Sequence, residues 1–293
     1  MKTAAATDKI ILLCLVALAL FAFAGNSLLN RAALVDTSAG SGAGPGVFAA
    51  IRLLSGAAAL LAFGMFKGFA IRPQRTDAPA VIALFVYAAA FSFAYVSLGA
   101  STGALVLFAT VQLTMTAHGL WRGSRYAPLQ ITGLLAALGG LAWLLAPGLR
   151  APPLGAALLM ICAGIAWGCY SILGRSQSNA TAATARNFIG TVPFALLMAA
   201  PLLWPGSPGI DAHSVVLAIV SGVVTSAFGY VIWYAVLPRL SAIAAASLQL
   251  IVPVIAIVGA QLWLQEPLTL RLLAASCIIL AGIALGIWGK RGL

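Results

Sequence analysis

Charged side chains are scarce in this sequence, and acidic ones are the scarcest. Of 293 residues only 7% are Asp, Glu, Lys or Arg, and only five are acidic. A soluble domain carries about 25% charged residues, so this composition excludes an ordinary water-facing surface. Apolar residues instead make up 62% of the chain and run in long unbroken stretches. Such runs exclude the short alternating strands of a membrane barrel and predict membrane-spanning helices.

Cysteine is also sparse, and the basic residues form no single patch. Cys14, Cys162, Cys169 and Cys277 lie within apolar stretches, at spacings that fit neither a metal site nor a disulfide framework. We expect them to be small buried apolar side chains. The net charge of +11 comes from basic residues placed singly or in small groups between apolar runs, which argues against a nucleic-acid partner. The sequence predicts no cofactor and no metal.

Ten apolar segments are each about 20 residues long, the length that crosses the hydrocarbon core of a bilayer. They fall at residues 10–30, 46–66, 79–98, 102–121, 128–147, 154–174, 184–204, 213–237, 240–264 and 269–289. The connections between them are short, so no soluble domain is expected. Pro193 and Pro253 are expected to kink their spans. The predicted fold class is an all-α integral membrane protein with ten transmembrane helices.

Lys and Arg are distributed unevenly between the two sides of this topology. With the N-terminus in the cytoplasm, eleven basic residues face that side: Lys2, Lys9, Lys67, Arg72, Arg75, Arg122, Arg125, Arg175, Arg239, Lys290 and Arg291. Only Arg31, Arg150 and Arg271 face the other side. Because cytoplasmic loops carry the excess of Lys and Arg, both termini are predicted to be cytoplasmic, in a plasma membrane of the bacterial inner-membrane type. Six tryptophans near span ends fit an interfacial belt: Trp121, Trp143, Trp204, Trp233, Trp263 and Trp288.

The two halves of the sequence resemble each other at three places in the same order. Residues 23–31 match 167–175, Arg52 and Gly56 match Arg186 and Gly190, and residues 95–98 match 234–237. We therefore expect two five-helix units, residues 1–147 and 148–293. An odd number of spans inverts the second unit, as in many secondary transporters whose solute site lies between the halves. The first segment imitates a secretory signal, but its counterpart in the second half predicts that it is retained.

A family resemblance rests on the second half. The segment from Arg239 to Pro253, with Leu262-Trp-Leu-Gln-Glu-Pro-Leu-Thr269 after it, resembles the signature of the drug/metabolite transporter superfamily and of its EamA-type exporters. The whole pattern also resembles YddG-type aromatic amino acid exporters. This resemblance implies ten helices around a central cavity and export of amino acids or other metabolites. The first half lacks the Pro and Glu that the family often has, and only Pro253 and Glu266 keep that pattern.

Ionisable groups are nearly absent from the predicted spans. Asp8, Asp36, Asp77, Asp211 and Glu266 all fall in tails, loops or span ends. A carboxylate inside the membrane is the usual group that binds a coupled proton or sodium ion. Because none is predicted here, our hypothesis is facilitated diffusion of the solute, or solute exchange that no buried acid drives. Arg52 and Arg186 fall early in repeat-related spans, where arginine either captures an anionic group or snorkels and bonds to neighbouring helix ends. We favour the second interpretation for both.

Aromatic residues form a sharper pattern than charged ones. Tyr87, Phe91 and Tyr95 recur every four residues and share one helix face, and a shift of 139 positions maps them onto Ser226, Tyr230 and Tyr234. Trp167 and Tyr170, three positions apart, also share a face. Buried Tyr and Trp polar groups need partners, which a wet cavity supplies together with flat apolar surface for a solute. Helix packing explains any single residue equally well, but the paired stripes favour a cavity.

Uncharged amides complete the candidate site. Asn26, Gln112 and Gln249 lie within spans, where they either join helices or orient a solute. Together with the aromatic residues they suit a zwitterionic or neutral solute with an apolar side chain. The predicted substrate-binding residues are Tyr87, Phe91, Tyr95, Trp167, Tyr170, Tyr230, Tyr234, Asn26, Gln112, Gln249 and Ser226.

The sequence therefore predicts a transporter and not an enzyme. The favoured function is export of amino acids, aromatic or other hydrophobic ones first, or of similar small metabolites by alternating access. Export of amines, sugars or drugs stays open. An integral membrane enzyme acting on lipid would need a nucleophile, a carboxylate pair or a metal cluster near the interface, and the sequence offers none. The expected partners are a small-molecule solute and the lipid bilayer, with the oligomeric state, monomer included, left open.

Overall fold

A computed structural model describes most of the chain. It covers residues 2–35, 44–68, 71–72, 74–123, 127–148, 151–175, 177, 179–203, 211–240 and 248–288, with side chains for residue 8 and for residues 10–286 within these ranges. Every regular element in this described part is a helix. Trp204 and Trp288, which we placed in the interfacial belt, and residues 241–247 of the family signature lie outside the described residues or side chains.

The first half contributes five long helices. They are α1 (Lys2–Leu34), α2 (Pro45–Lys67), α3 (Ala78–Tyr95), α4 (Ala100–Trp121) and α5 (Pro128–Leu145), and the short turn η2 (Arg75–Asp77) precedes α3. Proline stands in the first turn of α2, α3 and α5, where its missing N–H would be unpaired in any case. At its C-terminus α2 ends on Gly68, whose φ of 71° is in the left-handed region that favours glycine.

The second half repeats this order with more interruptions. Its elements are α6 (Leu154–Gly174), α7 (Ala180–Gly190), α8 (Val192–Ala199), η3 (Ala200–Leu203), α9 (Ala212–Val220), η4 (Ser221–Phe228), α10 (Gly229–Val236), η5 (Leu237–Arg239), α12 (Ile251–Trp263) and α13 (Leu270–Trp288). The seventh predicted span divides into α7 and α8 because Pro193 removes a backbone donor, which confirms the expected kink. Pro253 lies in the first turn of α12 and does not interrupt it.

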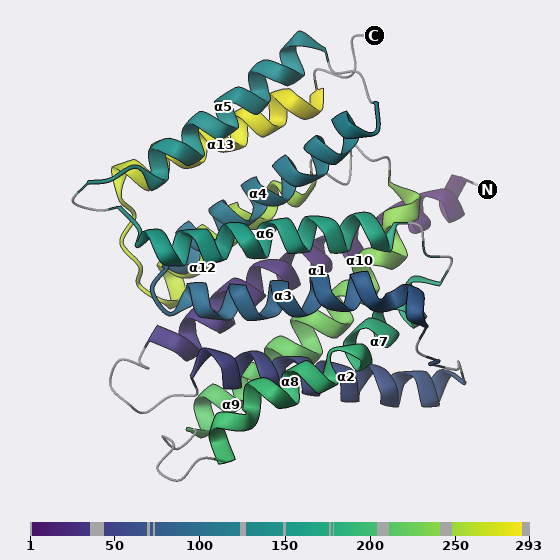
Figure 1. Cartoon of the computed structure of the whole chain (residues 1–293). Helices are drawn as coiled ribbons and strands as arrows, with labels where there is room; N and C mark the ends of the chain where they lie inside the picture. The colour runs from purple at the N-terminus through teal and green to yellow at the C-terminus, as the bar shows by residue number, and fades with distance from the viewer. Residues whose placement is uncertain are drawn as a thin grey trace.

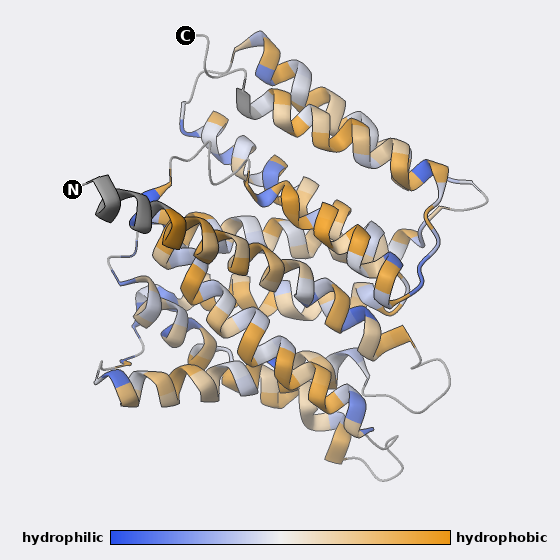
Figure 2. Cartoon of the chain, turned by 180° about the vertical axis from the view of Figure 1, so that it is seen from behind, coloured by the Kyte–Doolittle hydropathy of each residue, from blue (hydrophilic) through white to orange (hydrophobic). Residues whose placement is uncertain are grey.

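Eight of the described helical segments are long and apolar enough to cross a bilayer. The remaining two predicted spans correspond to shorter apolar helices, Ile251–Trp263 and Leu270–Gly286. Hydrophilic residues gather at the two ends of the bundle, and the helices between them are largely hydrophobic (Figure 2). Many large apolar side chains also face outward, among them Phe66, Leu197 and Leu262. This outer surface suits lipid and confirms an all-helical integral membrane protein.

Corresponding helices of the two halves make corresponding contacts, several of them with the first helix of the other half. In the first half α3 packs on α6, and in the second half the matching segment, η4 and α10, packs on α1. Likewise α4 packs on α6 as α12 packs on α1, while α5 and α13 pack on each other as a pair at one edge of the bundle (Figure 1). The helix contacts stay the same when each helix is replaced by its counterpart from the other half. This agrees with the repeat seen in the sequence.

Two expectations about single residues are wrong. All four cysteines are exposed on the outer face and not buried, because each lies on the side of its helix that meets no other helix. Trp233 is buried in the bundle, although we placed it in the interfacial belt. Its ring contacts Phe23 of α1 with centroids 5.6 Å apart. Trp121, Trp143 and Trp263 are exposed near helix ends, as the belt requires.

Candidate functional site

Seven of the predicted site residues form one continuous column of touching rings. From one end the column runs through Tyr95, Phe91, Tyr87, Trp167, Tyr170 and Tyr234, with Tyr230 against Trp167. Successive ring centroids lie 4.6–6.0 Å apart, within the range for favourable aromatic pairs. The rings come from α3 in the first half and from α6 and α10 in the second. The column therefore follows the contact between the two halves.

Trp167 is the centre of this column. It contacts Tyr87 at 4.9 Å, Tyr230 at 4.6 Å and Tyr170 at 5.5 Å. Phe23 of α1 closes the remaining side, 5.8 Å away in an edge-on arrangement. Each of these five side chains is at most 4% exposed. In this conformation the predicted cavity-lining rings are thus packed against one another and closed to solvent.

Arg52 of α2 lies beside the column, in surroundings that the sequence did not reveal. It is 1% exposed, so our preferred interpretation, snorkelling to the interface, is wrong. Its Nε donates to Ser226 Oγ at 2.9 Å, and its Nη2 donates to the hydroxyls of Tyr87 (3.2 Å) and Tyr230 (3.1 Å). Its guanidinium carbon also lies 5.2 Å from the ring centroids of Tyr87 and Phe91. Both repeat-related stripes therefore meet at one cation.

Asn26 joins α1 to the π-helical segment η4. Its Oδ1 accepts hydrogen bonds from Ser221 (2.9 Å), Thr225 (2.6 Å) and Ser226 (3.2 Å), and its Nδ2 donates to the Thr225 carbonyl at 3.1 Å. A π-helical turn loosens the normal hydrogen-bond ladder and is often found at functional sites. Asn26 thus supports Ser226, which in turn accepts from Arg52. Its described side-chain hydrogen bonds all go to η4, and its assignment to the solute site stays a prediction.

The two ends of the column rest on glycines. A Cβ at Gly103 would overlap the ring of Tyr95, and a Cβ at Gly174 would overlap the ring of Tyr234. Tyr234 donates to the Tyr170 carbonyl at 3.4 Å, whereas the Tyr95 hydroxyl has no partner among the described residues. Glycine at these two positions lets each terminal ring lie flat against a neighbouring helix. The rings close the column at opposite ends of the bundle.

The side chains of Gln112 and Gln249 share no hydrogen bond with the site residues that the structure describes. Gln249 is buried and Gln112 is half-buried. Neither side chain forms a hydrogen bond to another residue that the structure describes. Their assignment to the site stays a prediction.

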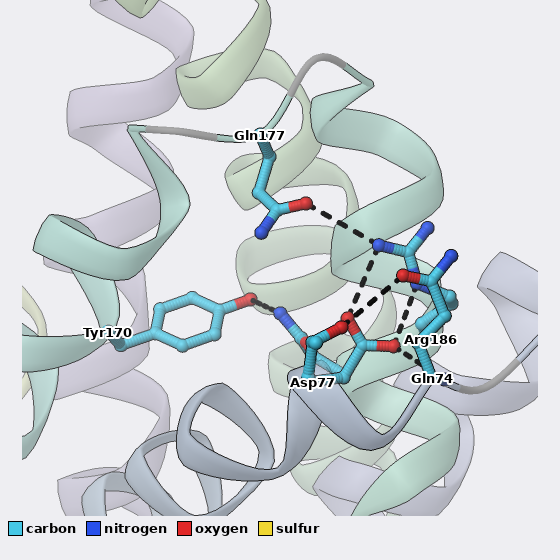
Figure 3. A network of polar contacts seen from close by, with 7 residues as sticks. Gln74, Asp77, Tyr170, Gln177 and Arg186 are labelled. Carbon is cyan, nitrogen blue, oxygen red and sulfur yellow. Dashed lines mark hydrogen bonds and ion pairs between the residues drawn. The ribbon is translucent and has the colours of Figure 1, made fainter.

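Arg186, the repeat counterpart of Arg52, has very different surroundings. Its Nε bonds to Asp77 Oδ2 at 2.9 Å and its Nη2 to Asp77 Oδ1 at 3.3 Å, with Gln177 at 3.5 Å (Figure 3). Asp77 also accepts from the backbone N–H of Gln74, which fixes the turn before α3. The prediction of bonds to neighbouring helix ends is correct for Arg186. Asp77 itself is buried, although the sequence placed it in a loop.

The opposite end of α3 carries a second ion pair. Glu266 accepts from the backbone N–H of Ala100 (2.7 Å) and of Ser101 (3.2 Å), and so caps the N-terminus of α4. Arg31 of α1 lies 3.5 Å from Glu266 and donates to the Tyr95 carbonyl at 2.9 Å. The family-signature glutamate therefore ties three segments together beside the last ring of the column.

Cavities lie near both ends of the column. One of about 260 Å³ lies at the Tyr95 end, lined by Ser97, Gly99, Thr102 and Arg271 among others. A much smaller one at the other end is lined by Tyr170, Gln177, Asn187 and Tyr234. Between these two cavities the rings of the column are packed against one another.

Several contributors escaped the sequence analysis. Phe23, Phe188 and Trp233 complete the ring cluster, with Phe188 5.9 Å from Tyr230. A signal for Phe23 was present, because it matches Trp167 in the internal repeat. No such signal distinguished Phe188 or Trp233, since their roles depend on which helix faces pack together.

Comparison with known proteins agrees with this architecture. The EamA-like transporter family matches residues 154–288. An uncharacterized protein of Pseudomonas aeruginosa is 47% identical over 273 residues, 93% of each chain. A protein of Salmonella typhimurium named as a probable amino-acid metabolite efflux pump is 26% identical over 217 residues, 69% of this chain and 73% of that one. A solved crystal structure superposes with a TM-score of 0.63 at 18% identity, covering 92% of this chain and 96% of the other.

The bundle of apolar helices and these similarities together define a membrane transporter for small molecules. The chain belongs to the EamA-like transporter family, within the drug/metabolite transporter superfamily, as the family match and the relatives together show. It is a transporter and not an enzyme.

Proposed function

We propose that this protein exports amino acids, with aromatic and other hydrophobic ones favoured, and that the aromatic column is its solute site. The observation that carries the proposal is the continuity of seven predicted rings from one end of the bundle to the other. Flat rings bind apolar side chains, and a small number of polar groups orients them. Relatives named as probable amino-acid metabolite efflux pumps support the choice of solute and of direction.

Alternating access follows from where the rings come from. We propose that residues 1–147 and 148–293 form two inverted units that rock against each other. Tyr87 belongs to the first unit, and Trp167 and Tyr230 belong to the second. Relative motion would separate these rings and admit a solute between them. The exchange of helix contacts between the halves supports this division.

For the orientation we propose a bacterial inner membrane with both termini in the cytoplasm. The basic residues concentrate on that side of the predicted topology. The start of α1 and the end of α13 lie at the same end of the bundle, which supports an even number of crossings (Figure 1).

Flux measurements on purified protein in liposomes test the solute site. Trp167→Ala, Tyr87→Ala and Tyr230→Ala should each lower the flux of L-phenylalanine or L-tryptophan by about tenfold or more, because each removes ring contacts worth about 1 kcal/mol plus buried area. Phe21→Ala is the matched control, since Phe21 lies on α1 two positions from Phe23 but is 62% exposed. Wild-type flux in all three ring variants would show that the column is packing and not a site.

A further inference from the structure

Arg52 is a buried cation for which the described protein supplies no carboxylate. It is 1% exposed and lies seven residues inside α2. Arginine stays protonated in proteins, and an unpaired charge at membrane depth is costly, so it marks a site that receives a partner. Four of the five acidic residues are engaged elsewhere, and Asp36 lies outside the described residues. Asp77 binds Arg186, Glu266 binds Arg31, Asp8 binds Arg239, and Asp211 caps α9.

The guanidinium is also incompletely hydrogen-bonded. Ser226, Tyr87 and Tyr230 accept from Nε and Nη2. Nη1 is buried and has no partner among the described residues. A buried N–H pair without acceptors is rare in folded proteins and calls for an explanation. A carboxylate can accept from the free N–H groups of Nη1, and a hydrogen bond between two charged groups is stronger than a neutral one.

The repeat counterpart provides an internal comparison. Arg186 occupies the corresponding place in the second half and holds a protein carboxylate, Asp77, through both Nε and Nη2. Arg52 instead contacts uncharged hydroxyls and rings of the aromatic column. The charge of Arg186 is therefore compensated by a carboxylate of the protein, whereas Arg52 keeps an unpaired donor group beside the rings.

We propose that Arg52 binds the carboxylate of the transported solute through Nη1, so that the substrate class is hydrophobic acids, amino acids included. This inference rests on the proposed function and deepens it. The carboxylate would accept from Nη1, the donor group of Arg52 that has no partner among the described residues, and the apolar side chain would lie among Tyr87, Trp167 and Tyr230. Amines and amides without a carboxylate would leave the charge of Arg52 uncompensated and would bind poorly.

Ligand-induced thermal stabilisation of the purified full-length protein tests this assignment directly. L-phenylalanine, L-tryptophan and L-leucine, each beside its amide, serve as probes, with sodium chloride as the inorganic-anion arm. The acids should raise the unfolding midpoint of the wild type and the amides should not. Arg52→Gln should weaken the apparent affinity for the acids by about tenfold to a hundredfold, the range for a lost hydrogen bond to a charged group. Arg186→Gln is the matched control and should keep the preference for acids over amides.

Four outcomes of the thermal-stabilisation experiment would contradict the assignment of Arg52 as the carboxylate-binding residue. Equal stabilisation by acid and amide, equal stabilisation by chloride, an unchanged Arg52→Gln affinity, or no response of the wild type to any acid would overturn it. If Arg52→Gln does not fold, Arg52→Lys keeps the charge but loses the fork, and it should retain only part of the acid preference. Full retention in Arg52→Lys would also overturn the role of Nη1.

Flux separates this inference from the proposed function. Binding of acids that depends on Arg52, without any solute flux in liposomes, would remove the transport proposal and leave the anion site. Equal flux of each amino acid and its amide, unchanged in Arg52→Lys, would remove the anion site and leave transport.

Discussion

At the scale of single residues, one amide supports the geometry of the site. Asn26 Oδ1 is shared by three hydroxyls of η4, and its Nδ2 binds a carbonyl of the same segment. Removing it leaves several buried polar groups unpaired, at a cost of about 1–3 kcal/mol for such a group. We expect Asn26→Ala to lower the unfolding midpoint by about 2–8 °C. Thr132→Ala is the control, because Thr132 is exposed and bonds only to its own helix. Equal midpoints for the two variants would contradict this role.

At the scale of elements, α2 and η4 approach each other through a glycine. A Cβ on Gly222 would overlap the Arg52 carbonyl oxygen and Ser55 Oγ. Gly222→Ala should therefore push η4 away from α2 and lower stability by about 1–3 kcal/mol, the usual cost of overpacking. Gly139→Ala in α5 is the matched control, since a Cβ there meets nothing within 4 Å. Thermal unfolding of both purified variants measures the difference, and a Gly222 variant as stable as the control would show that the two segments yield easily.

At the scale of the whole molecule, the proposed topology makes opposite sides of the bundle accessible from opposite sides of the membrane. In a variant without native cysteines, Ala151→Cys should react with a membrane-impermeant thiol reagent in intact cells. Arg122→Cys should react only after permeabilisation. Ala151 and Arg122 lie in the connections at the two ends of α5, which the topology assigns to the outer and the cytoplasmic side respectively. The reverse labelling pattern would invert the orientation and with it the direction that the positive-inside rule predicts.

Energy coupling also belongs to the whole molecule. Asp77 and Glu266 are held in ion pairs near the ends of α3, and no carboxylate of the described residues bonds to Arg52 or to the rings around Trp167 at the centre of the column. We therefore expect proteoliposomes to equilibrate or exchange solute at similar rates with and without a pH gradient, because no central acid carries the proton. Radiolabelled amino acid uptake under both conditions measures this. Strong accumulation driven by the gradient would refute the hypothesis and point to a proton carrier elsewhere.

Much of the fold follows from local properties of the chain. The bounds of α2, α4 and α6 agree with the predicted spans to within a few residues, because span length and hydropathy are properties of contiguous sequence. The aromatic column was accessible in the same way, since a four-residue spacing places rings on one helix face. The ninth predicted span is described only in part, since residues 241–247 lie outside the described residues, and its helix α12 ends at Trp263, one residue before the predicted end.

Composition and periodicity by themselves determined that this protein is a helical membrane protein, and they placed Tyr87, Phe91 and Tyr95 on one helix face. Tertiary structure alone decided that Arg52 is buried without a carboxylate while Arg186 binds Asp77, that Trp233 points inward, and that the cysteines face outward. The physical reason is that a side chain's environment depends on which helix faces it. Helices far apart in sequence, such as α2 and η4, meet only in the folded bundle.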